Sequence, residues 1–253
     1  MRFLQHGFKM VVAILAICLA ESAMAQQSGR CEPLVRAGAN YVVCAFQPAK
    51  SDMRLFWRDE QGDSFGGFDR LATAVEGRGG RLLFAMNAGM FQPDLSPVGL
   101  YVENGQEMRP LNRRGGQGNF NLKPNGVFWL KQGAAGVTES GKFAAQNMRP
   151  EFATQSGPML VIGGKVHPKI HADGTSEKIR NGVGQCEDGA IRFVISDDPV
   201  TFYSFASLFL ELKCPDALFL DGSISALYAP ALKRNDGWKS IGPMIGVVEG
   251  LKK

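Results

Sequence analysis

The chain has 253 residues, with 28 basic and 24 acidic side chains and a formal net charge of +4. This weak positive charge comes without a block of Lys and Arg, which argues against nucleic acid as a partner. After the N-terminal stretch, no segment approaches the roughly 20 apolar residues of a membrane-spanning helix, so we expect no stable membrane insertion.

The first 25 residues have the pattern of a secretory signal peptide. A basic start precedes the apolar stretch Met10–Ala20, and Ala23-Met24-Ala25 has the Ala-x-Ala form of a cleavage site. We therefore predict that residues 1–25 are removed on export and that residues 26–253 form a periplasmic or secreted domain. A lipoprotein signal at Cys18 is the weaker alternative, because a large isoleucine precedes this cysteine.

Four cysteines remain after cleavage, an even number that suits an oxidising compartment. We expect disulfides Cys31–Cys44 and Cys186–Cys214, because the members of each pair are near in sequence and flank strand-like segments. No pair has the C-x-x-C spacing of a metal site. Free, buried cysteines are the alternative.

The first hundred residues predict two strands, a helix and a third strand. The β-rich runs Tyr41–Phe46 and Met53–Trp57 are separated by a connection typical of a hairpin. Helical spacing from Phe68 to Val75 predicts a short amphipathic helix that covers the sheet. Leu82–Met86 is a predicted buried strand, and Asn87 follows directly where that strand ends.

The middle of the chain predicts a hairpin, a polar loop and a strand. Asn104-Gly105 is a strong hairpin signal. Residues 111–121 form a glycine-rich polar loop with no apolar period. The predicted strand Val127–Leu130 follows, so Asn121 and Lys123 are expected near its entrance.

A further polar cluster, Gln155-Ser156-Gly157, borders a predicted strand, a glycine turn and a return strand. His167 and His171 come next and are the histidines of the mature chain. Their spacing would suit a metal on a helix, but a nearby proline and glycine argue against a helix, so we expect no zinc site.

Arg180 lies in a predicted glycine-rich bend, Ile179–Gly184, where its guanidinium could bind a phosphate or carboxylate with little backbone in the way. A surface arginine at a hairpin is the alternative. Ile191–Ser196 is another predicted strand. Thr201 can cap a helix that runs to about Lys213.

The last predicted buried strand before the tail ends at an aspartate. Ala217–Leu220 is a short apolar run that stops at Asp221, so Asp221 occupies the same station at a strand end as Asn87. Gly222 would allow a ligand to approach closely, and Ser223 adds a hydroxyl. An isolated Asp-Gly is usually a turn signal, but the repeated pattern of polar residues at strand ends favours a site.

The many predicted strands and the two clear helices indicate an α+β fold. We expect a mixed β-sheet with a few packed helices. The tail adds one short strand candidate, Met244–Val248. Because there is no internal repeat and no Ser- or Pro-rich linker, we predict a single domain.

Five motifs in a fixed order give the chain a family resemblance. It resembles the phosphodiester glycosidase family, the domain of the lysosomal uncovering enzyme, in its bacterial exported branch, over about residues 40–250. The motifs are Asn87-Ala-Gly-Met-Phe91, Asn119-Phe-Asn-Leu-Lys-Pro-Asn-Gly-Val-Phe128, Gln155-Ser-Gly-Pro-Met-Leu160, Ile179-Arg-Asn-Gly-Val-Gly184 and Leu218-Phe-Leu-Asp-Gly-Ser-Ile-Ser225.

The resemblance implies hydrolysis of a sugar-1-phosphodiester in an envelope or extracellular glycan, at the bond between the anomeric carbon and the phosphate oxygen. It implies that Arg180 with Lys123 holds the phosphate, and that Asn87 and Gln155 orient sugar or phosphate oxygens. Asp221 is the expected general base or electrostatic stabiliser. The wider substrate-binding set would contain Asn121, Ser156, Gly157, Gly222 and Ser223.

The chain departs from the family pattern in two motifs. Members commonly have Asn-Gly-Gly-Phe-Phe where this chain has Asn87-Ala-Gly-Met-Phe91, and Asp-Gly-Gly-Gly-Ser where it has Asp221-Gly-Ser-Ile-Ser225. The loss of glycines narrows how closely a ligand can approach the backbone.

The second catalytic acid is left open among Asp197, Glu103 and Glu107. Two other functions also stay open. One is a non-catalytic periplasmic module that binds phosphorylated or acidic glycans. The other is metal-dependent cleavage with Asp197, Asp198 and Asp221 around Ca²⁺ or Mg²⁺; apart from this alternative we expect no cofactor.

Overall fold

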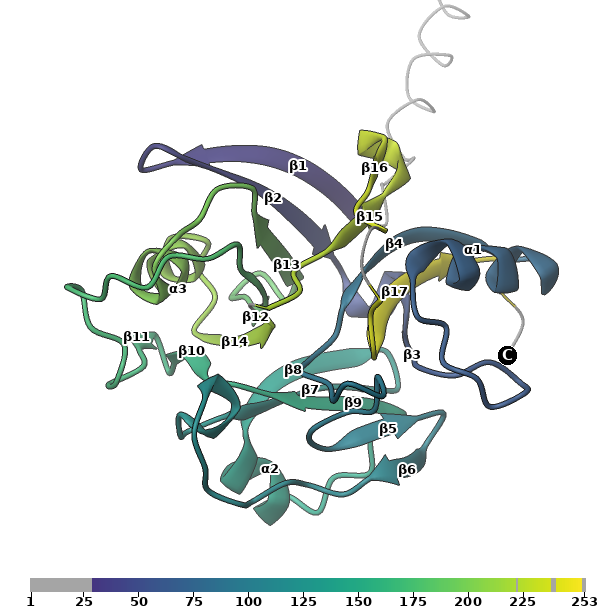
Figure 1. The fold of residues 1–253 in the computed structure, drawn as a ribbon, viewed down its shortest axis with the longest axis horizontal. Helices are drawn as coiled ribbons and strands as arrows, with labels where there is room; N and C mark the ends of the chain where they lie inside the picture. Colours follow the sequence, from purple (N-terminus) through teal and green to yellow (C-terminus); the bar gives the residue numbers. More distant parts are fainter. Residues whose placement is uncertain (1–28, 222, 238–239, 252–253) are drawn as a thin grey trace, which may run out of the picture.

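A computed structural model describes residues 29–221, 223–237 and 240–251. The predicted signal peptide lies outside these residues. The strands form three sheets, which surround a common interior (Figure 1).

The largest sheet has seven strands, in the order β1 (Gly29–Arg36), β2 (Ala39–Phe46), β13 (Ile191–Ser196), β12 (Asn181–Gln185), β14 (Asp216–Asp221), β10 (Met159–Ile162) and β11 (Lys165–Val166). A second sheet has the order β16 (Arg234–Asn235), β15 (Leu227–Ala229), β4 (Arg81–Asn87), β17 (Met244–Glu249) and β3 (Asp52–Phe56). The third has the order β6 (Gln106–Arg109), β5 (Tyr101–Glu103), β9 (Phe152–Ser156), β7 (Gly126–Lys131) and β8 (Ala134–Glu139).

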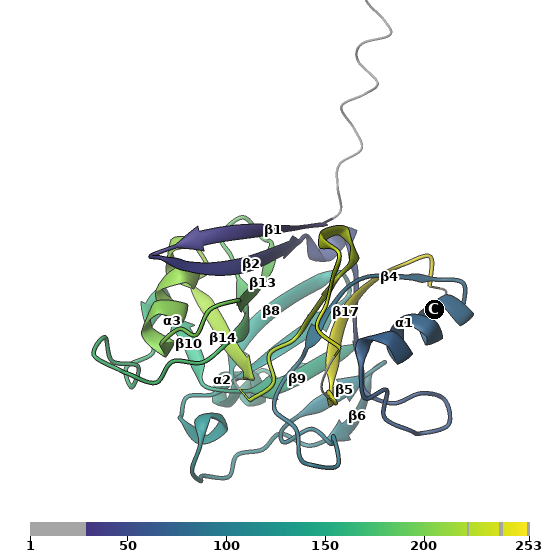
Figure 2. The ribbon, with the colours of Figure 1, turned by 45° about the horizontal axis from the view of Figure 1, so that its top comes forward.

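The helices are short and lie outside the sheets. They are α1 (Phe68–Gly77), α2 (Ser140–Ala145) and α3 (Phe202–Glu211), with 3₁₀ turns η1 (Pro48–Lys50), η2 (Asn119–Asn121) and η3 (Pro230–Leu232). α3 and α1 lie on opposite flanks of the molecule (Figure 2). Thr201 caps α3 as predicted, because its hydroxyl accepts a hydrogen bond from the Ser204 amide at 3.0 Å. In the described part of the chain, no helix has both the length and the hydropathy needed to cross a bilayer.

Three phenylalanines, one from each sheet, pack together in the centre of the core. The ring of Phe193 on β13 lies 5.0 Å from that of Phe84 on β4 and 5.7 Å from that of Phe128 on β7. All three side chains are fully buried. Because one continuous core joins the three sheets, the chain forms a single α+β domain, as predicted.

Two details of the predicted fold are wrong. The expected mixed sheet is instead three sheets, and every strand pair between described residues is antiparallel. The expected hairpin between β2 and β3 does not form either. β2 pairs with β1 and β13, whereas β3 pairs with β17 in the second sheet, and the 3₁₀ turn η1 carries the chain from one sheet to the other.

The glycine-rich segment around Arg180 is also not a bend. Residues 181–185 form β12, a strand with neighbours on both sides. Gly184 is needed there for close packing, because a Cβ atom at this position would come within 2.7 Å of the Phe209 ring and 2.9 Å of the Cys214 Cβ. The glycines therefore let α3 and its C-terminal cysteine approach the sheet.

Both predicted disulfides are present. Cys31 and Cys44 are directly opposite each other in the β1–β2 ladder, and their bond crosses these two strands. The Cys186–Cys214 bond joins the end of β12 to the residues that follow α3. Two disulfides fit a protein that folds in an oxidising compartment.

Candidate functional site

Three polar side chains meet where the seven-stranded sheet adjoins the sheet of β4. Asn87 is the last residue of β4, Asn181 is the first residue of β12, and Asp221 is the last residue of β14. All three are buried, and Asn181 lies opposite Asp221 in the antiparallel ladder. The predicted equivalence of Asn87 and Asp221 is therefore realised in space: two strand ends from different sheets converge on one point.

Asn181 is the centre of the hydrogen-bond network. Its Nδ2 donates to the backbone oxygen of Asn87 at 3.1 Å and to the side-chain Oδ1 of Asn87 at 2.9 Å. Its Oδ1 accepts from the backbone amide of Asp221 at 3.0 Å. Both ends of one carboxamide thus hold the two strand ends in register across the sheet junction.

A bulge in β14 sets the position of Asp221. Asn181 pairs with Asp221, but the next residue, Gly182, pairs with Phe219, so Leu220 is skipped. The freed backbone oxygen of Leu220 accepts a hydrogen bond from the Ser156 hydroxyl at 2.7 Å. Because a bulge redirects the residue next to it, this irregularity helps to aim Asp221 away from the ladder.

The loop after β14 wraps around the carboxylate. The Oδ1 atom of Asp221 accepts from the amide of Ser223 at 2.8 Å, and the Ser225 hydroxyl donates to the backbone oxygen of Asp221 at 2.8 Å. The amide of Ala226 donates to Oδ1 of Asn87 at 2.9 Å. The segment from 223 to 226 therefore connects the two sheets and closes the network. Gly222, predicted to line the site, lies outside the described residues.

Arg180 is next to Asn181 but makes a different set of contacts. Its Nε donates to the Val200 oxygen at 2.8 Å and its Nη2 to the Ser176 oxygen at 2.7 Å. The guanidinium lies 3.7 Å from the ring centre of Phe202 and 5.6 Å from that of Phe219, two residues before Asp221. Aromatic rings and backbone oxygens thus hold the cation in place.

The charge of Arg180 has no acidic counterpart in the described part of the chain. The side chain is 1% exposed, yet it forms no ion pair with a described residue. Burial lowers the pKa of Arg180 to about 10, so the guanidinium is still charged at neutral pH. A buried cation without a counterion is costly, and an anionic ligand would offset that cost.

Lys123 lies in another pocket. This pocket of about 550 Å³ is lined by Lys123 together with Arg113, Asn125 and Ser140, and its lining includes neither Arg180 nor Asp221. Burial lowers the pKa of Lys123, while Glu139 raises it. This pocket therefore contains Lys123 without Arg180. Asn121, predicted to bind substrate, donates its Nδ2 to the Gln117 oxygen at 2.9 Å within the same loop.

Gln155 and Ser156 reach opposite sides of β9. The Oε1 atom of Gln155 accepts from the amides of Leu100 and Asn112, and its Nε2 donates to the Asn112 oxygen and the Ser140 hydroxyl. Its four hydrogen bonds hold loops together, so contact with a substrate would compete with them. Ser156 instead faces β14. Gly157 packs against the Asn125 side chain, where a Cβ atom would approach to 2.6 Å.

The candidate second acids are dispersed over the molecule. Asp197 forms an ion pair with Arg234 at 2.6 Å, and Asp198 accepts from the backbone and side chain of Asn40. Glu103 and the exposed Glu107 belong to strands β5 and β6 of the third sheet. Asp197 and Asp198 are thus engaged with Arg234 and Asn40, and Glu103 and Glu107 belong to a different sheet from Asp221.

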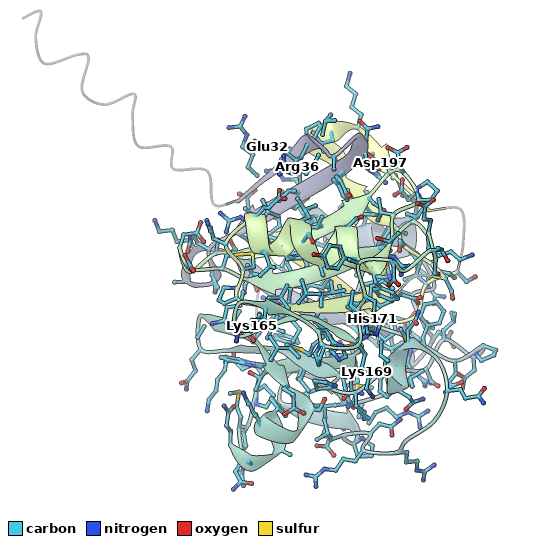
Figure 3. The ribbon with its side chains drawn as sticks, turned by 90° about the vertical axis from the view of Figure 1, so that its left-hand side faces the viewer. Glu32, Arg36, Lys165, Lys169, His171 and Asp197 are labelled. Carbon is cyan, nitrogen blue, oxygen red and sulfur yellow. A yellow bond between two sulfur atoms is a disulfide. The ribbon has the colours of Figure 1, made fainter. Side chains whose placement is uncertain are left out.

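The described residues also contain no cluster of three or more His, Cys, Asp or Glu side chains suited to a metal ion. His171 is exposed, and Figure 3 places it apart from Asp197 on the same side of the molecule. His167 is buried, and its Nδ1 accepts from the Lys169 amide at 3.1 Å. Burial lowers the pKa of His167. Asp197, Asp198 and Asp221 thus form no carboxylate cage in this part of the chain.

The sequence reasoning missed the central residue of the network, Asn181. Asn181 is the first residue of β12, whose sequence Asn-Gly-Val-Gly-Gln has no apolar run to indicate a strand. Because residues 179–184 were expected to form a bend, Asn181 was not predicted to lie at a strand end. The hydroxyl of Ser225 also belongs to the network, because it donates to the backbone oxygens of Asp221 and Ile179.

The strand ends carry a buried carboxylate and two coupled carboxamides, on an α+β scaffold of three antiparallel sheets. The neighbouring Arg180 is a buried cation without an acidic partner among the described residues. Such a site is suited to an anionic ligand rich in oxygen atoms.

Comparison with known proteins agrees with a site for an anionic ligand. The family model described as phosphodiester glycosidase matches residues 80–248, which include Asn87, Arg180, Asn181 and Asp221. The chain therefore belongs to the phosphodiester glycosidase family, as the five motifs had indicated.

A relative and two solved structures are similar to this chain. The uncharacterized protein YigE of Escherichia coli (strain K12) is 36% identical over 182 residues, which are 72% of this chain and 71% of that protein. The catalytic domain of zebrafish N-acetylglucosamine-1-phosphodiester alpha-N-acetylglucosaminidase, auto-inhibited by its pro-peptide, has a TM-score of 0.60 at 13% identity, covering 87% of this chain and 81% of that one. A protein of Burkholderia pseudomallei described as exported has a TM-score of 0.51 at 12% identity, covering 83% and 74%. The two structures support the fold.

Proposed function

We propose that this protein is an exported hydrolase that cleaves a sugar-1-phosphodiester in an envelope or extracellular glycan. The observation that carries the proposal is the buried guanidinium of Arg180, which has no acidic partner among the described residues. It lies 5.6 Å from the ring centre of Phe219, two residues before Asp221. A phosphodiester supplies the anion that this cation lacks. Membership of the phosphodiester glycosidase family supports the same substrate class.

In the proposed reaction, water adds to the anomeric carbon and the bond from that carbon to the phosphate oxygen breaks. The sugar leaves as a hemiacetal and the rest of the substrate as a phosphate monoester, which carries the electron pair of the broken bond. Arg180 stabilises the charge that develops on the phosphate. The leaving group is a good one, so the reaction needs less acid assistance than hydrolysis of an ordinary glycoside.

Asp221 is proposed to act on the water or on the positive charge at the anomeric carbon. Hydrogen bonds from the loop after β14 fix one carboxylate oxygen, which holds the group in a defined orientation. Asn87 and Asn181 are positioning residues in this scheme, because their carboxamides bind each other and the backbone around Asp221. Export is supported by the two disulfides.

The test is turnover of a panel of sugar-1-phosphodiesters by the purified protein, followed by NMR. Asp221→Asn should lower kcat/KM by about 100-fold or more, the range expected for a catalytic base. Asp216→Asn is the matched control, since Asp216 begins the same strand and only accepts from the Gly163 amide. It should retain activity within about threefold, by analogy with other surface changes.

Arg180→Gln should also lower kcat/KM by about 100-fold, because it removes the proposed charge on the phosphate. Arg192→Gln on the neighbouring strand is its control, since Arg192 forms a surface ion pair with Asp188. An Asp221→Asn protein that keeps more than a tenth of the activity would contradict the assignment. Binding of the panel without turnover would instead favour a non-catalytic module for phosphorylated or acidic glycans.

A further inference from the structure

A second pocket lies beside α2, away from the strand ends that carry Asp221. It has a volume of about 550 Å³, and we call it the α2 pocket. The side chains that matter for its chemistry are Asn112, Arg113, Lys123, Asn125, Glu139 and Ser140.

Strand β9 separates the α2 pocket from Asp221. Gln155 and Ser156 are consecutive residues of this strand, and successive side chains of a strand point to opposite faces. The amide of Gln155 reaches Ser140 in the α2 pocket, whereas the hydroxyl of Ser156 reaches the Leu220 oxygen beside Asp221. A ligand in the α2 pocket therefore occupies a different place from the proposed reaction.

The pocket carries two cations and one carboxylate, that of Glu139, which raises the pKa of Lys123. Neither Arg113 nor Lys123 forms an ion pair with another described residue. The carboxylate of Glu139, which also lines the pocket, already accepts from the amides of Gly141 and Lys142 at 2.8 and 3.0 Å. The pocket thus offers positive charge to a ligand.

The segment that builds the pocket concentrates the positive charge of the protein. Residues 105–149 contain seven basic and two acidic side chains, a net charge of +5, whereas the whole chain has a net charge of +4. The remainder of the chain therefore has a net charge of −1. A local excess of this kind attracts anions and raises their concentration near the surface.

The neutral groups in the pocket are suited to hydroxyls. The Oδ1 atom of Asn125 is buried and has no hydrogen-bond partner among the described residues, while its Nδ2 donates to the Phe120 oxygen at 3.0 Å. The Ser140 hydroxyl accepts from Gln155 at 3.2 Å, which allows its own proton to be donated to a ligand. A buried acceptor without a donor is costly, so a ligand hydroxyl that donates to it would be stabilising.

Two cations, an unpartnered acceptor and a hydroxyl together match a molecule that has both a negative charge and several hydroxyl groups. We propose that the α2 pocket is a binding site for an acidic saccharide, separate from the catalytic site, which holds a charged sugar unit of a glycan. The site would tether the protein to an acidic glycan chain while the reaction takes place on the other side of β9.

The test is calorimetric titration of the Asp221→Asn protein, which removes turnover without changing the α2 pocket. The probes are trigalacturonate, neutral maltotriose and glucose 1-phosphate, all at the same ionic strength. Trigalacturonate should bind at least tenfold more tightly than maltotriose. Adding Arg113→Gln and Lys123→Gln together should weaken trigalacturonate binding by tenfold or more.

Arg114→Gln and Lys142→Gln are matched controls, because these cations belong to the same basic segment but do not line the pocket. They should change binding by less than threefold. Equal binding of the charged and neutral trisaccharides, or equal losses in the controls, would overturn the proposal. Binding of glucose 1-phosphate that depends on Arg113 and Lys123, without binding of trigalacturonate, would show a phosphate site and would also overturn it.

Thermal melts of every variant separate loss of binding from loss of folding. Turnover of sugar-1-phosphodiesters by the parent protein is measured in parallel. Turnover without trigalacturonate binding refutes the α2 site alone, and trigalacturonate binding without turnover refutes the proposed reaction alone.

Discussion

Asn181 shows how one carboxamide can join two sheets. Its nitrogen binds the end of β4 and its oxygen binds the amide of Asp221 at the end of β14. An aspartate at this position would have the same shape, but it would place an acceptor against the oxygens of Asn87. The residue therefore needs both a donor and an acceptor, which only a carboxamide of this length supplies.

We predict that Asn181→Ala destabilises the protein and removes activity together. The change removes the side-chain acceptor of the Asp221 amide and one of the donors to Oδ1 of Asn87. A buried polar group that loses its partner costs about 1–3 kcal/mol. The melting temperature should fall by several degrees. Asn121→Ala is the control, because Asn121 is half-exposed and bonds only within its own loop. Equal melting temperatures for the two variants would show that Asn181 is not a structural centre.

The positions of single residues could be predicted where a residue ends a strand. They could not be predicted where a long side chain packs against a distant segment. Asn87 and Asp221 follow apolar runs, and the apolar run itself indicates the strand end. Arg180 and Lys123 share a charge, but nothing in their sequence context reveals that one packs under Phe202 and the other lies beside α2. Their separation depends on tertiary packing between distant segments.

At the scale of elements, β5 carries a half-buried acid, Glu103, in a different sheet from Asp221. The Tyr101 hydroxyl donates to Oε2 of Glu103 at 2.7 Å, and the tyrosine is fully buried. Burial raises the pKa of Glu103, although the Tyr101 hydrogen bond opposes the shift. Since the folded state disfavours the ionised form, the contribution of Glu103 to stability is greatest below its unfolded pKa of about 4.3 and is lost as pH rises through the folded pKa.

We predict that Glu103→Gln stabilises the protein at pH 7 and has less effect at pH 4. The glutamine keeps an oxygen that accepts from Tyr101 and carries no charge. Each 1 kcal/mol regained should raise the melting temperature by about 2–4 °C in a chain of this size. The exposed Glu107→Gln on β6 is the matched control. A gain that is the same at pH 4 and pH 7 would contradict a role for ionisation.

Most elements could be predicted because each carries its own pattern. The hairpin of β5 and β6 has Asn104 and Gly105 at positive φ, as the Asn-Gly signal requires. Strand β12 was not predicted because its glycines resemble those of a loop. Glycine is needed in this strand because α3 packs closely against it. The three-sheet arrangement was missed because period-two patterns identify strands but not their partners.

At the scale of the whole molecule, both disulfides lie in or beside the seven-stranded sheet. Cys31–Cys44 closes a loop with a sequence separation of 13, and Cys186–Cys214 closes one of 28. The second sheet, which carries Asn87, has no disulfide between its described residues. We therefore expect the stability of the second sheet to depend on its packing in the core that it shares with the disulfide-bonded sheet.

We predict that each disulfide contributes about 2–4 kcal/mol, with the larger share from Cys186–Cys214. The longer loop should add roughly 0.7 kcal/mol in the chain-entropy treatment. Unfolding in urea of Cys186→Ala/Cys214→Ala and of Cys31→Ala/Cys44→Ala, compared with the parent protein with and without reductant, measures both values. If the parent were equally stable with and without reductant, neither bond would stabilise the fold.

The position of β17 has a consequence for how this protein is made. Although it is the last strand along the described sequence, β17 lies between β4 and β3, so the sheet that carries Asn87 cannot close until residues 244–249 have arrived. A chain emerging from the ribosome therefore stays incompletely folded during most of its synthesis. For the export that we propose, this late closure of the sheet would keep the nascent chain unfolded until transport.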